Sequence, residues 1–193
     1  MHVERAEKRD ALVGILRSEK VERAIVFTRT KRGADKVCEF LQKAGINSGA
    51  IHGNKSQPQR ERTLAAFRDK KTRILVATDI AARGIDIDDV SHVINYELPN
   101  VPEAYVHRIG RTARAGKSGI AISLCEHAER GLLRDIERLI GNTVHRDGVV
   151  EVAANTESRE EQAPRPPRQP PPGDPRVVPR RESSRPSPRR TRR

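Results

Sequence analysis

The sequence predicts an α/β fold: an open, mainly parallel sheet sandwiched by helices, with a disordered C-terminal tail. Short apolar runs of strand type alternate along the chain with segments whose apolar residues have helical spacing. The apolar runs lack a clean alternation of polar and apolar residues, which indicates a sheet covered on both faces. Residues with unusual chemistry follow the ends of these runs, where open α/β sheets bind their ligands.

The first strand and its flanking helices occupy residues 4 to 45. An amphipathic helix is expected over residues 4 to about 18, followed by a strand at residues 24–27. Thr30 can cap the next helix through its hydroxyl, and Gly45 ends it. The inward faces of the two helices would consist of Ala11, Leu12, Ile15 and Leu16, and of Ala34, Val37, Leu41 and Ala44.

The rest of the chain repeats this pattern. Residues 48–53 are expected to form a strand and a tight turn, and Ser56 with Pro58 opens the following helix. Three further strands are predicted, at residues 73–78, 92–96 and 119–124. Helical spacing predicts a third helix with Leu64, Ala65 and Phe67, and a last helix with a buried side of Leu132, Leu133, Ile136, Leu139 and Ile140.

The composition indicates a polyanionic partner. The chain has 193 residues, with 38 Lys and Arg against 26 Asp and Glu, a net charge of +12 and a pI of about 10.5. Such a balance favours binding to nucleic acid or another anionic surface. The two cysteines, Cys38 and Cys125, are far apart and fit no metal or disulfide pattern, so both are expected to be small buried residues. No apolar run approaches membrane-spanning length, and the protein is expected to be soluble and cytoplasmic.

The tail is expected to begin at about residue 147. Residues 151–193 hold ten of the 13 prolines, eleven Arg and six Asp or Glu, a net charge of +5 that leaves +7 for residues 1–150. Little apolar content remains, so this segment cannot bury enough surface to fold. Two roles stay open for it: a solubilising appendage, or a salt-sensitive, sequence-independent contact with RNA.

The segment 105–116 concentrates positive charge. Arg108, Arg111 and Arg114 recur at every third residue, so on a helical turn they would point roughly one way. Clustered guanidinium groups without an equal number of carboxylates are suited to bind oxyanions, phosphate above all. The alternative is a solvated basic face. Because the segment follows a predicted strand end, where ligands bind in such sheets, we favour a functional interpretation.

Four segments together resemble the motif series of a known family. They read Ile-Val-Phe-Thr-Arg-Thr at 25–30, Ile-His-Gly at 51–53 with Gln-Pro-Gln-Arg at 57–60, Ala-Thr-Asp-Ile-Ala-Ala-Arg-Gly-Ile-Asp at 77–86, and His-Arg-Ile-Gly-Arg-Thr-Ala-Arg at 107–114. In this order and spacing they resemble the second RecA-like domain of DEAD-box RNA helicases, over about residues 5 to 145. The sequence of residues 51–57 and the Arg/Pro-rich tail are most similar to the bacterial RhlE-type branch. Ala113 departs from the glycine that many family members have there.

The sequence also lacks two motifs of that family. It has no Gly-x-x-x-x-Gly-Lys-Ser/Thr loop to hold a triphosphate with Mg²⁺, and no Asp-Glu-Ala-Asp run. Both belong to the family's first domain, so the chain looks like half of an enzyme. We divide it into a remnant of the interdomain linker at 1–10, a helicase C-terminal domain at 11–146 and the tail at 147–193.

The resemblance implies an ATP site shared between two lobes. ATP and Mg²⁺ would be held mainly by the missing N-terminal domain, and no metal site is expected in this chain. Arg111 and Arg114 would act as arginine fingers, which stabilise charge on the γ-phosphoryl group. His107 would tie the arginine loop to the acidic motif of the other lobe. Gly84 and Asp86 would contact ATP, with the Asp86 carboxylate bound to a ribose hydroxyl.

Two further residues of these motifs are expected to be structural. Arg108 would anchor the arginine loop through an ion pair. Phe27 would pack in the core and contact the arginine motif.

The resemblance further implies RNA binding through sugar and phosphate, without sequence preference. The residues expected to make these contacts are Thr30, Gly53, Arg60, Thr78, Asp79 and Arg83. The whole enzyme would be a monomeric RNA-dependent ATPase that unwinds RNA locally when ATP closes the lobes, while this chain alone would be inactive. Two alternatives stay open: a stand-alone, non-catalytic RNA-binding or regulatory module, and the equivalent domain of a DNA helicase.

Overall fold

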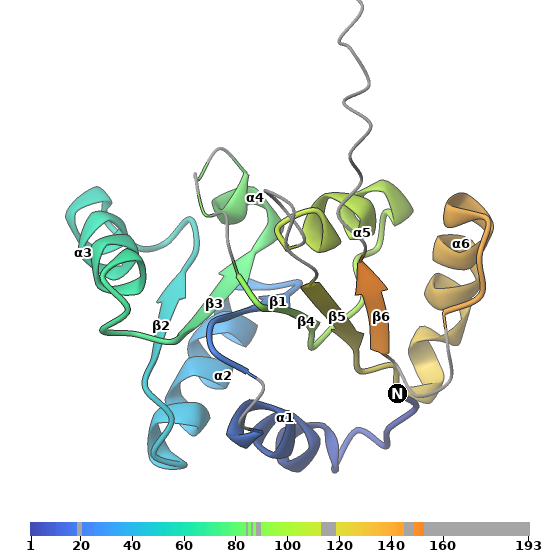
Figure 1. The fold of residues 1–193 in the computed structure, drawn as a ribbon, viewed down its shortest axis with the longest axis horizontal. Helices are drawn as coiled ribbons and strands as arrows, with labels where there is room; N and C mark the ends of the chain where they lie inside the picture. The colour runs from blue at the N-terminus through green and yellow to red at the C-terminus, as the bar shows by residue number, and fades with distance from the viewer. Residues whose placement is uncertain are drawn as a thin grey trace, which may run out of the picture. The chain divides into compact units, whose positions relative to one another are not determined.

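A single sheet runs through the part of the chain that the structure describes, in the strand order β2-β3-β1-β4-β5-β6 (Figure 1). This computed structural model describes residues 1–18, 21–83, 85, 87, 90–112, 119–144 and 149–152. All of them belong to the first of two units, Met1–Ser158 and Arg159–Arg193. Gly84, Asp86, Arg114 and the expected tail from 153 onward lie outside the described residues. The strands are β1 Ala24–Thr28, β2 Ser48–Ile51, β3 Ile74–Thr78, β4 His92–Asn95, β5 Gly119–Ser123 and β6 Val149–Val152.

The first five strands pair in parallel, as the sequence predicts. Phe27 lies opposite Ala77 of β3 on one side and opposite Asn95 of β4 on the other, so the carboxyl ends of the central strands are in register. β6 was not expected: it pairs antiparallel with β5, with Val152 opposite Gly119. The expectation that residues 149–152 belong to the tail is therefore wrong. Four residues without clear alternation carry too little signal to predict a strand.

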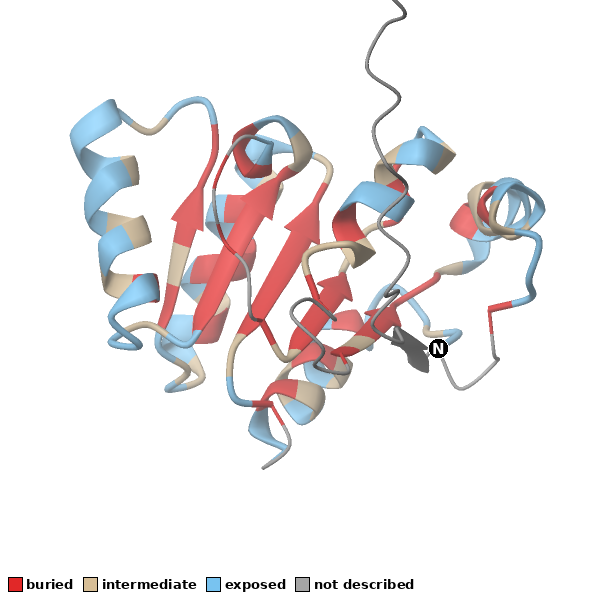
Figure 2. Cartoon of the chain, turned by 45° about the horizontal axis from the view of Figure 1, so that its top comes forward, coloured by how far each residue is buried: buried red, intermediate tan, exposed pale blue. Residues whose placement is uncertain are grey.

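Helices cover both faces of the sheet, which explains why its strands read as continuous apolar runs. On β1, Val26 packs in a cluster with Leu12 of α1 and Leu41 of α2, while Phe27 packs in a cluster with Phe67 of α3. Figure 2 shows strands β1 to β5 as mostly buried and the outer sides of the helices as exposed. The helices are α1 Lys8–Arg17, α2 Lys31–Lys43, α3 Gln57–Arg68, α4 Asp79–Ala82, α5 Pro102–Ile109, the 3₁₀ helix η1 His127–Glu129 and α6 Arg130–Ile140.

Local chemistry sets the ends of two helices where the sequence predicted them. The Thr30 hydroxyl accepts a hydrogen bond from the backbone N–H of Gly33 at 2.9 Å and caps α2. Gly45 follows the end of α2 with φ +78°, a conformation that favours glycine. At α3, the side chain of Gln59 accepts a hydrogen bond from the backbone N–H of Ser56 at 3.0 Å.

Several expectations for helices need correction. α1 begins at Lys8 rather than near residue 4, inside the segment that the sequence analysis assigned to a linker. Leu139, expected on the buried side of α6, is 46% exposed, whereas Ile136 is fully buried. A helical spacing rule assigns a residue to a face without knowing how wide the neighbouring element is, so residues at the margin of the face are misplaced.

The two cysteines lie in the core. Cys38 and Cys125 are both free and buried, as predicted, and burial raises the pKa of each thiol. Of the helices in the described ranges, none has the length and apolar character needed to cross a membrane. The described residues also contain no group of three or more His, Cys, Asp or Glu side chains placed to hold a metal ion.

Candidate functional site

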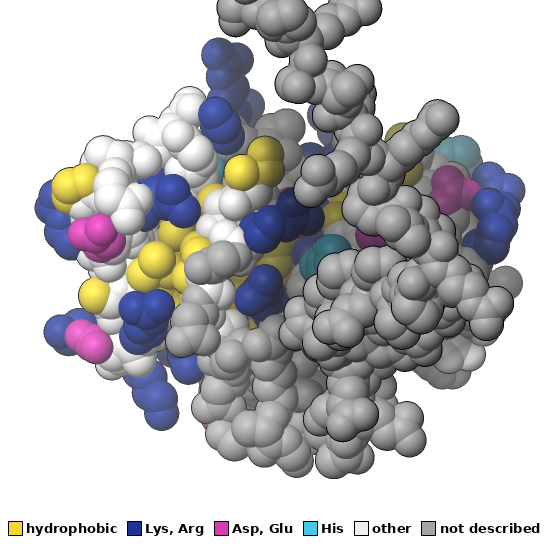
Figure 3. All heavy atoms as spheres, turned by 90° about the horizontal axis from the view of Figure 1, so that it is seen from above, with side chains coloured by type: hydrophobic (Ala, Val, Ile, Leu, Met, Phe, Trp, Pro, Cys, Tyr) yellow, Lys and Arg dark blue, Asp and Glu magenta, His cyan; other side chains and the backbone are white. Residues whose placement is uncertain are grey.

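The carboxyl ends of the parallel strands bring most of the predicted site residues to one edge of the sheet. Thr28 at the end of β1 lies opposite Thr78 at the end of β3, and Ile51 at the end of β2 lies opposite Ala77. Thr30, Gly53 and Asp79 follow these strand ends directly. Figure 3 shows this face from above, with Lys and Arg side chains spread over it between hydrophobic atoms. The structure therefore gathers residues that are up to 49 positions apart in sequence, from Thr30 to Asp79.

Arg108 forms the centre of a buried polar network beneath this face. Its Nε and Nη2 atoms donate to the two carboxylate oxygens of Asp79 at 2.6 and 2.8 Å. Its Nη1 atom donates to Asn95 Oδ1 at 3.0 Å and to the backbone carbonyl of Glu97 at 2.7 Å. The guanidinium also lies 5.0 Å from the centre of the Phe27 ring. A planar, five-donor guanidinium fits such a site, and an ammonium does not.

This network confirms two of the sequence predictions. Arg108 is anchored by an ion pair, and Phe27 is both part of the core and in contact with the arginine motif. It also gives Asp79 a structural role, because both of its carboxylate oxygens are engaged by Arg108. The RNA contact expected for Asp79 stays a prediction. Thr78 is buried, and it directly precedes the short helix α4.

A pocket of about 210 Å³ opens beside the Arg108 network. Besides Asp79 and Arg108, it brings together Arg83, which follows α4, His107 on α5, and Arg111, which follows α5. The residues around it are Phe27, Asp79, Ala82, Arg83, Ala104, His107, Arg108 and Arg111. The structure thus brings together two predicted RNA-binding residues, Asp79 and Arg83, and two predicted catalytic residues, His107 and Arg111.

Arg111 differs from Arg108 in how its charge is used. α5 ends at Ile109, so Arg111 lies beyond the helix rather than on it. Its Nη1 atom donates to the backbone carbonyl of Ile85 at 3.2 Å, and its guanidinium borders the pocket, half-buried. Among the described residues no carboxylate forms an ion pair with it. A guanidinium that is held by one hydrogen bond, and that forms no ion pair within the described residues, can bind an oxyanion.

The remaining predicted residues are spread along the same edge. His107 is exposed at the last turn of α5. Gly53 is exposed in the turn after β2, whereas Arg60 on α3 is half-buried and its Nε has no hydrogen-bond partner within the described part of the chain. Arg83 is exposed at the end of α4.

Lys31 and Asn54 also lie at this edge, although the sequence did not indicate them. Lys31 begins α2, and its Nζ atom donates to Asn54 Oδ1 at 2.8 Å beside Gly53. Lys31 directly follows Thr30 in the first motif, which was the only available signal. A contact over 23 positions depends on the pairing of strands and cannot be read from local pattern.

Comparison with known proteins agrees with this arrangement. The family described as "Helicase conserved C-terminal domain" matches residues 7–116. The fold, the arginine-lined pocket and this match define a helicase C-terminal domain.

Similar proteins show which kind of helicase this domain resembles. The chain is 47% identical over 138 residues to the ATP-dependent RNA helicase DeaD of Buchnera aphidicola subsp. Baizongia pistaciae, covering 72% of this chain and 23% of that protein. It is 46% identical over 138 residues to the DEAD-box ATP-dependent RNA helicase CshA of Bacillus cereus, covering 72% of this chain and 26% of that protein. The chain therefore belongs to the C-terminal domains of the DEAD-box RNA helicase family. It spans about a quarter of the length of these relatives.

Solved structures show the same relationship. The E. coli DEAD-box protein SrmB, in a complex with regulator of ribonuclease activity A, matches with a TM-score of 0.70 and 40% identity, over 73% of this chain and 84% of that chain. A DEAD box protein from Methanococcus jannaschii matches with a TM-score of 0.69 and 47% identity, over 73% and 39% of the two chains. The RhlE-type branch suggested by the sequence is not confirmed, because the two helicase relatives with 47% and 46% identity are of the DeaD and CshA types.

Proposed function

We propose that this chain is the C-terminal part of an ATP-dependent RNA helicase, and that it supplies Arg111 and Arg114 to an ATP site completed by an N-terminal RecA-like domain. The observation that carries the proposal is the contrast between Arg108 and Arg111. Arg108 is fully buried and neutralised by Asp79, whereas Arg111 borders an open pocket next to His107. Phosphoryl transfer needs positive charge where negative charge develops on the γ-phosphoryl oxygens, and the guanidinium of Arg111 at the pocket supports this role.

The nucleotide itself would be held mainly outside this chain. A bound ATP with Mg²⁺ supplies the reactive phosphoanhydride, and the N-terminal domain would hold both. Arg111 would contact the γ-phosphoryl group, and His107, exposed at the rim, would contact the other domain. Arg114, Gly84 and Asp86 are proposed to take part in ATP binding on the strength of the motif resemblance.

RNA would lie across the carboxyl-end face and be held by its backbone. Thr30, Gly53, Arg60, Thr78, Asp79 and Arg83 are the proposed contacts. Their chemistry suits phosphate and sugar rather than base edges, so the binding would be independent of sequence. We also propose a monomer in the cytoplasm, where RNA substrates occur.

The test joins the chain to the N-terminal domain of a DEAD-box relative and measures RNA-stimulated ATP hydrolysis. We expect Arg111→Ala and Arg114→Ala each to lower turnover by about 10³-fold or more, with little change in RNA affinity. Arg62→Ala, an exposed arginine on α3 away from the pocket, is the matched control and should leave turnover unchanged.

Two outcomes would contradict the proposal. Equal losses of turnover and RNA affinity in Arg111→Ala would show that this arginine binds RNA instead. ATP hydrolysis by the purified chain alone, abolished by Arg111→Ala, would show that no second domain is needed.

A further inference from the structure

We propose that His52 is a positioning residue for RNA binding. In this proposal its buried imidazole fixes the turn over residues 52–55, so that the Gly53 backbone and the Lys31 ammonium together face one phosphate of the RNA strand. The inference rests on the proposed RNA-binding function. It adds a residue whose side chain is 2% exposed and which therefore cannot itself touch RNA in this conformation.

The hydrogen bonds of His52 select one tautomer. Its Nδ1 atom lies 3.3 Å from the backbone nitrogen of Asn54, and its Nε2 atom lies 2.9 Å from Asp35 Oδ1. A backbone N–H can only donate, so Nδ1 must be the unprotonated acceptor. Nε2 then carries the proton and donates it to the carboxylate. One imidazole thus joins the turn after β2 to helix α2.

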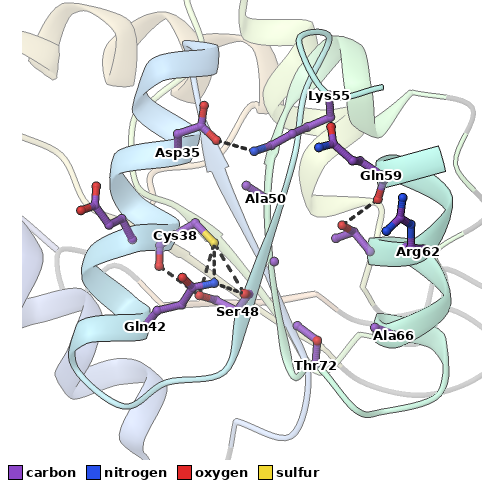
Figure 4. Close-up of a pocket in the computed structure, with 13 residues that line it drawn as sticks. Asp35, Cys38, Gln42, Ser48, Ala50, Lys55, Gln59, Arg62, Ala66 and Thr72 are labelled. Carbon is purple, nitrogen blue, oxygen red and sulfur yellow. Dashed lines mark hydrogen bonds and ion pairs between the residues drawn. The ribbon is translucent and has the colours of Figure 1, made fainter. Parts of the chain in front are cut away.

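Asp35 secures this connection from α2. Its Oδ1 atom also accepts a hydrogen bond from Lys55 Nζ at 2.9 Å, an ion pair drawn in Figure 4. Burial alone would raise the pKa of Asp35, but the hydrogen bonds from His52 and Lys55 outweigh it and the net pKa lies below its ordinary value. The carboxylate is therefore ionised near neutral pH. Both ends of the turn, His52 and Lys55, are held by the same carboxylate oxygen.

Hydrogen bonds within residues 52–55 also hold the backbone of the turn. The N–H of Lys55 donates to the carbonyl of His52 at 3.0 Å, an i to i+3 bond that defines a β-turn with Gly53 and Asn54 at its centre. The bond from the Asn54 N–H to His52 Nδ1 reaches two residues along the chain, as an Asx-turn does. His52 therefore provides, from a ring nitrogen, what an Asn or Asp side chain commonly provides in turns.

The turn presents a cation above a glycine. Lys31 Nζ donates to Asn54 Oδ1 at 2.8 Å. Lys31 Cε and Nζ would lie 3.3 and 3.5 Å from a Cβ placed on Gly53. Both Gly53 and Lys31 are exposed, and within the described ranges Lys31 forms no ion pair. A phosphate that approaches the bare backbone of Gly53 would meet the Lys31 ammonium at the same time.

Two substitutions of His52 separate its two hydrogen bonds. His52→Asn keeps an oxygen that can accept from the Asn54 N–H in an Asx-turn, but its short side chain loses Asp35. His52→Gln is long enough to donate toward Asp35, but no longer offers the acceptor at the Nδ1 position. If the turn bond is what positions the phosphate contact, the first variant should bind RNA better than the second.

The experiment measures binding of the full chain to a fluorescein-labelled single-stranded oligouridylate by anisotropy at several salt concentrations. We expect His52→Gln to weaken binding several-fold and to reduce the slope of log affinity against log salt by about 0.7, the effect of one lost phosphate contact on a single strand. His52→Asn should restore most of both quantities. Lys31→Gln should reduce the slope equally, and the double variant should be no weaker than the weaker single variant, because both residues serve one contact.

His92→Gln is the matched control. It also removes a buried histidine, but His92 lies at the amino end of β4, whereas His52 follows the carboxyl end of β2. It should lower the melting temperature without changing the salt slope. The proposal is overturned if His52→Gln lowers the melting temperature but keeps the wild-type affinity and slope, or if the effects of His52→Gln and Lys31→Gln add fully. Failure of the unaltered chain to bind RNA at any salt concentration would instead overturn the RNA-binding function on which the proposal depends.

Discussion

Lys8 and Glu129 form a buried ion pair, with Nζ 2.6 Å from Oε2, that joins α1 to η1 across 121 positions of sequence. The two side chains are 4% and 2% exposed. Glu129 also accepts the backbone N–H groups of Leu98 at 3.1 Å and Glu126 at 3.2 Å. Arg29 Nη2 lies 3.4 Å from its other oxygen. One carboxylate therefore holds four separate segments of the chain together.

We expect Glu129→Ala to lower the free energy of unfolding by about 3–5 kcal/mol, because it leaves the Lys8 ammonium buried without its main partner. Urea unfolding followed by circular dichroism measures the change. Glu39→Ala, which removes the exposed partner of Lys43 on α2, is the control and should have no measurable effect. Similar losses in both variants would show that burial of the Lys8–Glu129 pair carries no special weight.

Arg108→Lys should be strongly destabilising although it keeps the charge. An ammonium cannot reproduce the paired bonds to Asp79 together with those to Asn95 and Glu97, so buried acceptors lose their donors. The free energy of unfolding should fall by about 2–3 kcal/mol. The same change at Arg111, with its one bond to the Ile85 carbonyl, should cost less than about 1 kcal/mol. Chemical denaturation of both variants tests the contrast, which fails if the two losses are equal.

Gly49→Ala and Gly131→Ala should change stability in opposite directions. A Cβ on Gly49 in β2 would lie 2.8 Å from Thr63 Cγ2, so α3 would have to move away from the sheet, at a cost of about 1–3 kcal/mol. A Cβ on Gly131 in α6 has no atom within 4 Å and should stabilise the helix by about 0.5–1 kcal/mol. Thermal unfolding of the two variants measures both effects. A stabilising Gly49→Ala would contradict the close packing of α3 on β2.

His92 should contribute to the pH dependence of stability. Burial at the start of β4 lowers its pKa in the folded state below the ordinary histidine value. The unfolded chain then binds more protons below about pH 6.5, so the stabilisation is present above that pH and is lost as the pH falls toward the folded pKa. The free energy of unfolding should therefore decrease between pH 7 and pH 5, and less steeply in His92→Gln. Parallel slopes in the two proteins would exclude this contribution.

Much of the architecture could be predicted because its signals are local. Thr30, Gly45 and Ser56 mark helix ends through contacts with residues a few positions away. Strands β1 to β5 fall where apolar runs predict them. β6 escaped prediction because four residues without clear alternation carry too little local signal.

The sequence predicted which residues make up the candidate site. It did not show which contacts each of them makes. Sequence spacing treats Arg108 and Arg111 alike, and the expectation that Arg108 is structural came from the family resemblance. In the structure α5 directs Arg108 into the core toward Asp79, and the chain leaves the helix before Arg111. The link from His52 to Asp35 was not foreseen, because the two residues are 17 positions apart and meet only in the folded chain.

By itself the sequence determined the alternation of strands and helices, the places where helices start and stop, and the motif series that belongs to DEAD-box helicase C-terminal domains. The elements and their ends depend on residues within a turn or two of each other, and the motif series depends on the order of four short segments along the chain. Only the tertiary structure decided which arginine is neutralised, which histidine holds the turn at Gly53, and that Lys8 reaches Glu129. The physical reason is that these contacts form only after strands distant in sequence have paired in one order and one register.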